Sequence, residues 1–372
     1  MGFKYPADDL SSLATSASSF PLLVYDYDEE PDSTQTVISV ADRSSRTYHV
    51  PELRSCRYLE TPSGLLLMVN SASLQSSLWN PQTGERIALP PMDKALPEHC
   101  ECLLSDAVSS PNCIVLIYDL GQPDLLFCKV NGGSAWASHS CDFGPRAVPV
   151  SPSAPKPMDF TTMAAVQGKF YYIKSRDVIG VLSFAHQPEP EPRLEEITTF
   201  DATMPTIKSD APLVLTIRFL LESCNELFLV CLFLVSTNFE RIEEVGSYRM
   251  DFARREWCKV TDIGDRAFLV GPGNFGASCA AAEHGLKRGC VYFSYDFLGG
   301  TFNYHIFDLV EGTREIAGPP TQGTIPVACR EPFWMVPVLP QSFFFFFGVN
   351  CEDCIYDHEA TGLSGNWEWY SL

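Results

Sequence analysis

The sequence is poor in positive charge. It contains 26 lysine and arginine residues against 46 aspartate and glutamate residues, which gives a formal net charge of -20. A surface with this excess of negative charge repels phosphate backbones and anionic lipid headgroups. We therefore expect neither nucleic acid nor a membrane surface among the partners of this chain.

Targeting and membrane-spanning signals are also scarce. The opening stretch, "MGFKYPADDLSSLATSASSF", has no arginine and no basic region followed by an apolar run, so neither a secretory signal nor an organellar transit peptide fits. The apolar segment Leu213–Val235 is interrupted by Arg218, Glu222 and Glu226, and its unbroken part is only about half as long as a spanning helix. We expect buried strands in this segment and a cytoplasmic or nuclear location for the chain.

The fourteen cysteines are scattered through the chain. Several of them, such as Cys113, Cys128, Cys231 and Cys290, lie in apolar runs that are typical of strands. A chain of this length has no need of a disulfide framework to stabilise its core. We therefore predict buried, reduced thiols.

Four stretches of the chain share one pattern, in which an alternating strand is followed by Asp or Asn, a short polar turn and a second strand. They are "VISVADRSSRTYHVPEL", "SSLWNPQTGERIALPPM", "SYRMDFARREWCKVTDI" and "YHIFDLVEGTREIAGPP". The polar landmarks are Asp42, Asn80, Asp251 and Asp308, with weaker copies around Asn131 and Phe184. The spacing averages roughly fifty residues, which is close to the repeat of kelch-type propellers.

The pattern favours a propeller for a physical reason. An Asp or Asn at a strand end can accept hydrogen bonds from the backbone of its own turn, and this turn reverses the chain into an antiparallel hairpin. A single hairpin cannot bury its apolar face, whereas four-stranded sheets packed radially bury both faces. We predict an all-β, kelch-like β-propeller of six or seven four-stranded blades. Helix is expected only at Asp9–Ser18 and Ala277–Gly285.

Four motifs, taken in their order along the chain, resemble those of the plant KIB-type β-propeller family, which comprises F-box/kelch-like proteins. The motifs are "WNPQTGERIALPPM", "FLLESCNELFLV", "RMDFARREWCKVTDIGDRAFLVGPGNFGAS" and "GLKRGCVYF". On this basis we divide the chain into an N-terminal lead without an F-box (1–19), the propeller (20–340) and an atypical C-terminal tail (341–372). The tail contains five consecutive phenylalanines, Phe343–Phe347.

The resemblance implies a propeller that recognises a protein, normally behind an F-box that binds the Skp1 adaptor of a cullin-type ubiquitin ligase. The first nineteen residues are too few for an F-box, so we do not expect Skp1 to bind this chain. We predict a monomeric, non-catalytic module that binds an unidentified target protein, with no cofactor or metal. No individual binding residue is predicted. A degenerate, non-functional copy is an alternative.

The sequence contains one motif of nucleotide-binding enzymes. The loop Gly271–Gly276, "GPGNFG", satisfies G-x-G-x-x-G after a strand-like run, and such a loop can hold a pyrophosphate at the start of a helix. Pro272 lies inside the turn, and strands alternating with long helices are not predicted around it. We favour a glycine-rich connection within a blade and keep a nucleotide-dependent enzyme as the alternative.

Other chemical signals are weaker. The tail contains Cys351 and Cys354 with His358, a spacing that suits zinc but lacks a fourth ligand. His305 is expected to be an ordinary strand residue. Glu195 and Glu196 belong to "HQPEPEPRLEEI", which we interpret as a solvated loop.

Four tryptophans, at positions 79, 136, 257 and 334, lie in or beside runs that are typical of strands. We expect Trp257 in the core. Aromatic rings that reach a rim of the propeller would be hot spots for protein binding.

Overall fold

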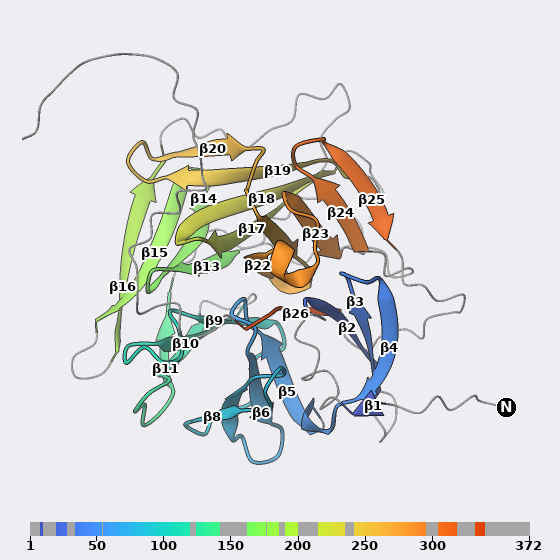
Figure 1. Cartoon of the computed structure of the whole chain (residues 1–372). Helices are drawn as coiled ribbons and strands as arrows, with labels where there is room; N and C mark the ends of the chain where they lie inside the picture. Colours follow the sequence, from blue (N-terminus) through green and yellow to red (C-terminus); the bar gives the residue numbers. More distant parts are fainter. Residues whose placement is uncertain are drawn as a thin grey trace, which may run out of the picture. The chain divides into compact units, whose positions relative to one another are not determined.

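The part of the protein that the structure describes consists of six mostly antiparallel sheets with very little helix (Figure 1). The computed structural model describes residues 8–9, 20–27, 34–53, 55–119, 124–141, 162–175, 177–185, 190–199, 215–234, 242–294, 304–317 and 332–338. Four sheets contain four strands and two contain five. We number the sheets as blades 1 to 6 in chain order.

The strands of the first three blades are as follows. Blade 1 contains β1 (Asp8–Asp9), β2 (Leu22–Tyr27), β3 (Thr34–Ser39), β4 (Ser44–His49) and β26 (Phe333–Met335). Blade 2 contains β5 (Cys56–Glu60), β6 (Leu66–Asn70), β7 (Ser76–Trp79) and β8 (Arg86–Leu89). Blade 3 contains β9 (Cys100–Leu104), β10 (Ile114–Asp119), β11 (Asp124–Lys129) and β12 (Ala137–Ser140).

The remaining three blades continue in the same way. Blade 4 contains β13 (Met163–Val166), β14 (Lys169–Ser175), β15 (Val178–Ala185) and β16 (Glu191–Thr198). Blade 5 contains β17 (Leu215–Ser223), β18 (Glu226–Leu234), β19 (Ile242–Asp251) and β20 (Glu256–Val260). Blade 6 contains β21 (Arg266–Val270), β22 (Gly276–Ala280), β23 (Cys290–Ser294), β24 (Tyr304–Asp308) and β25 (Thr313–Ala317). Short 3-10 turns are η2 (Pro51–Leu53), η3 (Pro272–Asn274) and η4 (Ala282–His284).

The blades follow one another in a closed ring (Figure 1). One edge strand of each sheet lies beside the edge strand of the next, in the order β26, β5, β9, β13, β17 and β22. Blades 6 and 1 meet where the indole N–H of Trp334 donates to the Val270 carbonyl at 3.0 Å. The all-β propeller is therefore confirmed, and the number of blades is six.

Blade 1 is assembled from two distant parts of the chain. Strands β2, β3 and β4 come from the first fifty residues, while the inner strand β26 comes from residues 333–335 and pairs antiparallel with β2 through Leu22 and Met335. The buried Trp334 side chain is only 1% exposed. Pairing between the two chain regions gives blade 1 its inner edge strand and joins the two ends of the ring.

The six sequence landmarks each fall in a different blade. Five lie in or directly beside the turn between the two strands of an outer hairpin, whereas Phe184 lies within β15. Asp251 Oδ1 accepts the backbone N–H groups of Ala253 and Arg254, both at 2.9 Å. Asp308 Oδ1 accepts those of Val310 and Glu311 at 3.0 and 2.9 Å. Corresponding bonds occur at Asp42 and Asn80. As predicted, these side-chain hydrogen bonds stabilise the turns at which the chain reverses direction between the two outer strands.

The core lies between neighbouring blades as well as between strands. Within the segment Leu213–Val235, residues 215–223 and 226–234 form β17 and β18, as predicted, and every residue from Leu227 to Leu234 is buried. Burial raises the pKa of Cys113, Cys128 and Cys231 to about 12 and that of Cys290 to about 11. These four thiols are buried and form no disulfide, as predicted, whereas Cys224 is exposed and Cys56 and Cys258 are only partly buried.

Two local predictions are wrong. The expected helix Ala277–Gly285 is instead strand β22 followed by the 3-10 turn η4. The stretch around Glu195 and Glu196 is not a loop, because residues 191–198 form the edge strand β16. An edge strand tolerates Pro192 and exposed glutamates, since its outer side has no partner strand.

Some predicted features lie outside the described residues. They are most of the helix expected at Asp9–Ser18, and the tail 341–372 with Phe343–Phe347, Cys351, Cys354 and His358. Within the described ranges, no helix has the length and hydrophobicity needed to cross a bilayer.

Candidate functional site

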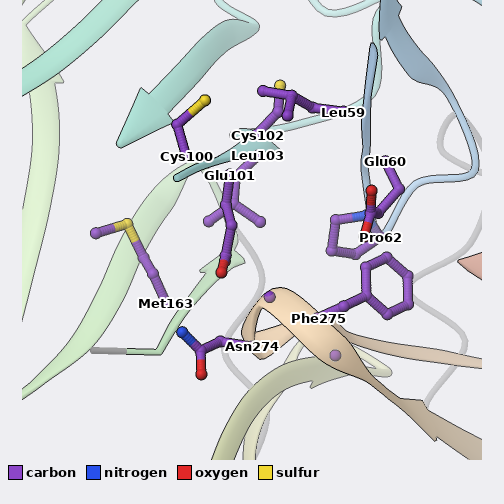
Figure 2. Close-up of a pocket in the computed structure, with 12 residues that line it drawn as sticks. Leu59, Glu60, Pro62, Cys100, Glu101, Cys102, Leu103, Met163, Asn274 and Phe275 are labelled. Atoms are coloured by element: carbon purple, nitrogen blue, oxygen red, sulfur yellow. The ribbon is translucent and has the colours of Figure 1, made fainter. Parts of the chain in front are cut away.

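A cavity lies where the inner strands of the blades converge (Figure 2). Its walls come from β5 of blade 2, β9 of blade 3, β13 of blade 4 and the Gly271–Gly276 loop of blade 6. Gly273 is exposed, and Glu60 and Pro62 are partly exposed, so the cavity opens to solvent. Its position follows from the ring, because only the inner strands reach the centre.

The cavity is small. Its volume is about 70 Å³, whereas pockets for drug-sized ligands usually measure about 300–1,000 Å³. The space suits one side chain or a small ion with its water, and it is too small for a dinucleotide.

The polar groups of the cavity are two carboxylates and one amide. Glu101 extends from β9 towards the Gly271–Gly276 loop (Figure 2), and a Cβ placed on Gly273 would lie 3.6 Å from its Oε1 atom. Glu60 lies at the end of β5, and the Asn274 side chain is only 8% exposed. Carboxylate and amide oxygens make the cavity a site for hydrogen-bond donors and positive charge.

Glu101 is supported from behind by Tyr118 of β10. The Tyr118 hydroxyl donates a hydrogen bond to Glu101 Oε2. Burial of the ring and the nearby Glu101 charge raise the pKa of Tyr118 well above its usual value. The phenol therefore stays protonated and serves as a fixed donor that positions the carboxylate.

The two cysteines in the cavity wall do not have the properties of reactive thiols. Figure 2 shows the sulfur atoms of Cys100 and Cys102 pointing away from the Gly271–Gly276 loop. Burial raises the pKa of Cys100 to about 12 and raises the pKa of Cys102 well above its usual value. A thiol must ionise to act as a nucleophile, so neither group is activated.

The Gly271–Gly276 loop is a connection within blade 6, as the sequence favoured. It joins the antiparallel strands β21 and β22, and Val270 pairs with Gly276. The chain continues as a strand after Gly276, so the loop lacks the helix start that a dinucleotide site uses. A Cβ on Gly276 would lie 2.6 Å from the Leu220 carbonyl oxygen, so this glycine permits the close approach of blades 5 and 6.

The comparison with protein families gives one decisive result. Residues 37–311 match the model of the KIB1-4 β-propeller. The chain belongs to this family.

Several solved structures match this KIB1-4 β-propeller chain at low sequence identity and low TM-score. AofleA from Arthrobotrys oligospora is 10% identical, with 82% of each chain covered and a TM-score of 0.32. The WD40 domain of SCAP from fission yeast is 8% identical, with 77% of this chain and 82% of that chain covered and a TM-score of 0.32. Hsv2 from Kluyvelomyces marxianus is 10% identical, with 64% and 68% covered and a TM-score of 0.29. A search of curated proteins finds no match.

The other residues singled out in the sequence lie away from the cavity of this KIB1-4 β-propeller. His305 is half-buried on β24 and stacks on Phe293, with ring centroids 4.9 Å apart. Burial, reinforced by the Arg314 charge, lowers the pKa of His305 to about 4. Glu195 and Glu196 are exposed on β16. No group of three or more potential metal ligands occurs in the described part of the chain.

The four tryptophans have different environments. Trp79 and Trp334 are buried, at 2% and 1% exposure. Trp136 is partly buried and donates its indole N–H to the Pro90 carbonyl at 2.8 Å. Trp257, which was expected in the core, is only partly buried at the edge of the cluster between blades 4 and 5. Near it, exposed Phe252 packs on Tyr171 of the neighbouring blade at 5.4 Å between centroids.

The sequence did not reveal Glu60, Glu101 or Asn274 as neighbours. They come from blades 2, 3 and 6. Asn274 lies in the Gly271–Gly276 motif, but nothing in the local sequence of Glu60 or Glu101 distinguishes them from other strand residues. The only available signal is positional: Glu60 and Glu101 lie on the first strands of their blades, and first strands line the centre of a propeller.

Proposed function

We propose that this chain is a non-catalytic protein-recognition module, related to the substrate-binding propellers of F-box proteins. The observation that carries the proposal is the match to the KIB1-4 β-propeller over residues 37–311. Two features of the cavity support it: a volume of about 70 Å³ and thiols kept protonated by burial. The residues that line the cavity include no histidine, serine or threonine.

The finer role follows from the resemblance to F-box proteins. A propeller that binds a target without engaging Skp1 acts as a free adaptor or as a competitor of a ubiquitin-ligase receptor for the same target. We propose that the 372-residue chain works in this way as a monomer, in the cytosol or the nucleus. Its charge of -20 disfavours nucleic acid and anionic membranes as partners.

Direct binding experiments test this function. Affinity purification of the tagged chain, followed by reconstitution with each purified candidate, is expected to give a direct complex with a specific protein. In a parallel experiment, purified Skp1 is expected not to bind. Failure to reconstitute any direct complex would contradict protein recognition, and a stable Skp1 complex would contradict the adaptor role.

A thermal-unfolding experiment tests the enzymatic alternative. Ligands that bind the native state raise its unfolding midpoint according to their concentration and affinity. We expect nicotinamide and adenine nucleotides at millimolar concentration to leave the midpoint unchanged. A concentration-dependent rise would support a nucleotide-dependent enzyme, whereas the absence of any cooperative transition would support a degenerate copy.

A further inference from the structure

Blade 4 has the longest outer edge strand among the described residues. β16 contains eight residues, whereas β8, β12, β20 and β25 contain four or five. β4 contains six, and β1 covers its edge. All eight residues of β16 pair with β15 in one continuous register. Such an edge presents a regular row of N–H and C=O groups with which another strand can form hydrogen bonds.

Blade 1 shows that an outer edge in this ring accepts an added strand. Asp8 and Asp9 of β1 pair in parallel with Tyr48 and His49 of β4. No strand in the described part of the chain pairs with the outer side of β16 (Figure 1). Pro192 lacks an N–H group, so one donor at most is missing from that side. An extended segment can therefore join blade 4 as a fifth strand.

One face of β16 carries charges that alternate in sign. Successive side chains of a strand point to opposite faces of the sheet, so Glu191, Arg193 and Glu195 lie on the same face, and all three are exposed. Ile197 follows on this face and packs at the margin of the cluster between blades 4 and 5. Along the strand, this face presents negative, positive, negative and apolar groups to a neighbouring strand.

The other face of β16 is apolar at its centre and electrically balanced. Leu194 is 44% exposed on this face. Glu196 follows it, and its carboxylate pairs with the Lys174 ammonium at 2.6 Å. A partner strand therefore gains from an apolar side chain opposite Leu194 and needs no cation opposite Glu196.

These side chains define the chemistry of a complementary strand. Side chains directly opposite each other on paired strands stabilise the pair when their charges are opposite or when both are apolar. The most favourable partner places a cation opposite Glu195, an anion opposite Arg193 and apolar side chains opposite Leu194 and Ile197. Antiparallel pairing is slightly more stable per residue than parallel pairing. An antiparallel partner therefore reads, from its N-terminus, apolar, polar, basic, apolar, acidic.

We propose that the outer edge of β16 binds an extended segment of the target protein as an added antiparallel strand with this order of side chains. Main-chain hydrogen bonds supply the affinity of such a complex, and the opposed side chains supply its specificity. A second copy of the chain is the less suitable occupant, because two molecules of charge -20 repel each other. The inference rests on the proposed protein-recognition function and adds the mode by which the target is recognised.

Fluorescence anisotropy with a matched pair of labelled, capped peptides tests the charge pattern. The complementary peptide has the order Thr, Val, Thr, Lys, Val, Glu, Thr, Lys. The exchanged peptide has the same composition and net charge, but its central Lys and Glu have changed places, so like charges oppose Glu195 and Arg193. At low ionic strength, where surface charges are least screened, the exchanged peptide is expected to bind the wild-type chain about fivefold more weakly.

Backbone methylation of the complementary peptide tests the strand pairing itself. The N–H groups of an extended peptide point alternately to its two edges, so methyl groups on every second nitrogen block one edge only. Of the two isomers that carry these methyl groups, one is expected to lose binding and the other to keep it. Equal binding of both isomers, or an equal loss, would contradict pairing through a single edge.

Three variants locate the binding edge. Glu195→Lys is expected to weaken the complementary peptide and to strengthen the exchanged peptide, each by about threefold. Arg193→Glu is expected to change both affinities in the same directions and replaces the first variant if that one is unstable. Glu311→Lys makes the same charge change in the exposed turn after β24 and is expected to leave the ratio of the two affinities unchanged. Unchanged thermal midpoints identify folded proteins.

The results separate this inference from the function on which it rests. No saturable binding, equal affinities of the two peptides, or a wild-type ratio in Glu195→Lys and Arg193→Glu would overturn the β16 site. A dimer in sedimentation experiments that the complementary peptide dissociates would assign the edge to a second copy and overturn it too. A reconstituted target complex insensitive to both variants would overturn it while leaving protein recognition intact. Absence of any target complex, with the peptide results as expected, would contradict the proposed function instead.

Discussion

Gly276 is the position at which the packing of the ring can be tested most directly. Its backbone is not in the left-handed region, and an added Cβ would lie 2.6 Å from the Leu220 carbonyl oxygen and 3.1 Å from Leu221 Cβ. Two physical effects oppose each other in Gly276→Ala. Reduced freedom of the unfolded chain stabilises such a substitution by about 0.4–1 kcal/mol, whereas overpacking against a backbone atom costs about 1–3 kcal/mol.

The steric overlap with the Leu220 carbonyl oxygen is expected to outweigh the stabilisation from the less flexible unfolded chain, because β17 and β22 must separate by several tenths of an ångström to relieve the overlap. The middle of each range, about 2 kcal/mol of cost against about 0.7 kcal/mol of gain, leaves a net loss of about 1.3 kcal/mol. It lowers the thermal midpoint by a few degrees, since domains of roughly 150–250 residues shift by about 2–4 °C per kcal/mol.

Thermal and urea unfolding followed by tryptophan fluorescence measure the effect. Gly276→Val extends the series, because a larger side chain deepens the overlap and should lower both midpoints further. A Gly276→Ala protein as stable as the wild type, or more stable, would refute the close-approach role of this glycine. The G-x-G-x-x-G pattern would then need another explanation.

Two further predictions concern blades 1 and 6. Trp334→Phe removes the donor to the Val270 carbonyl and is expected to lower the free energy of unfolding by about 1–3 kcal/mol; an unchanged urea midpoint would show that this bond does not hold the ring closed. Burial lowers the pKa of His305 to about 4 from 6.5, so the unfolded chain binds more protons between these values and stability falls as the pH drops from 6.5 towards 4. His305→Phe keeps a ring against Phe293 and is expected to flatten this dependence in urea unfolding series across that interval; a dependence as steep as that of the wild type would assign it to other groups.

The outer hairpins could be predicted from the sequence because their cause is local. Asp42, Asn80, Asp251 and Asp308 accept hydrogen bonds from backbone groups two or three residues further along. The residues that specify each turn are therefore neighbours in the chain, and their repetition reveals the blades.

Strand β22 could not be predicted because its cause is tertiary. The stretch Ala277–His284 is rich in alanine, the residue with the highest helix propensity. In the fold, Gly276 packs closely against β17, whereas Ala277 is buried in the core cluster formed by blades 6 and 1. The cavity could not be predicted for the same reason, since Glu60, Glu101 and Asn274 are distant in sequence and become neighbours only in the folded ring.

Strand β26 is translated long after the strands of blade 1 that it completes, and this has a consequence during synthesis. When β2, β3 and β4 leave the ribosome, the strand that completes their sheet has not yet been translated, and at usual elongation rates it follows on the order of tens of seconds later. During that interval the nascent chain carries an unpaired edge at β2, which other strands can join. A stop codon that removes residues 333–335 would make this temporary exposure permanent, so truncated products are expected to aggregate or to recruit chaperones.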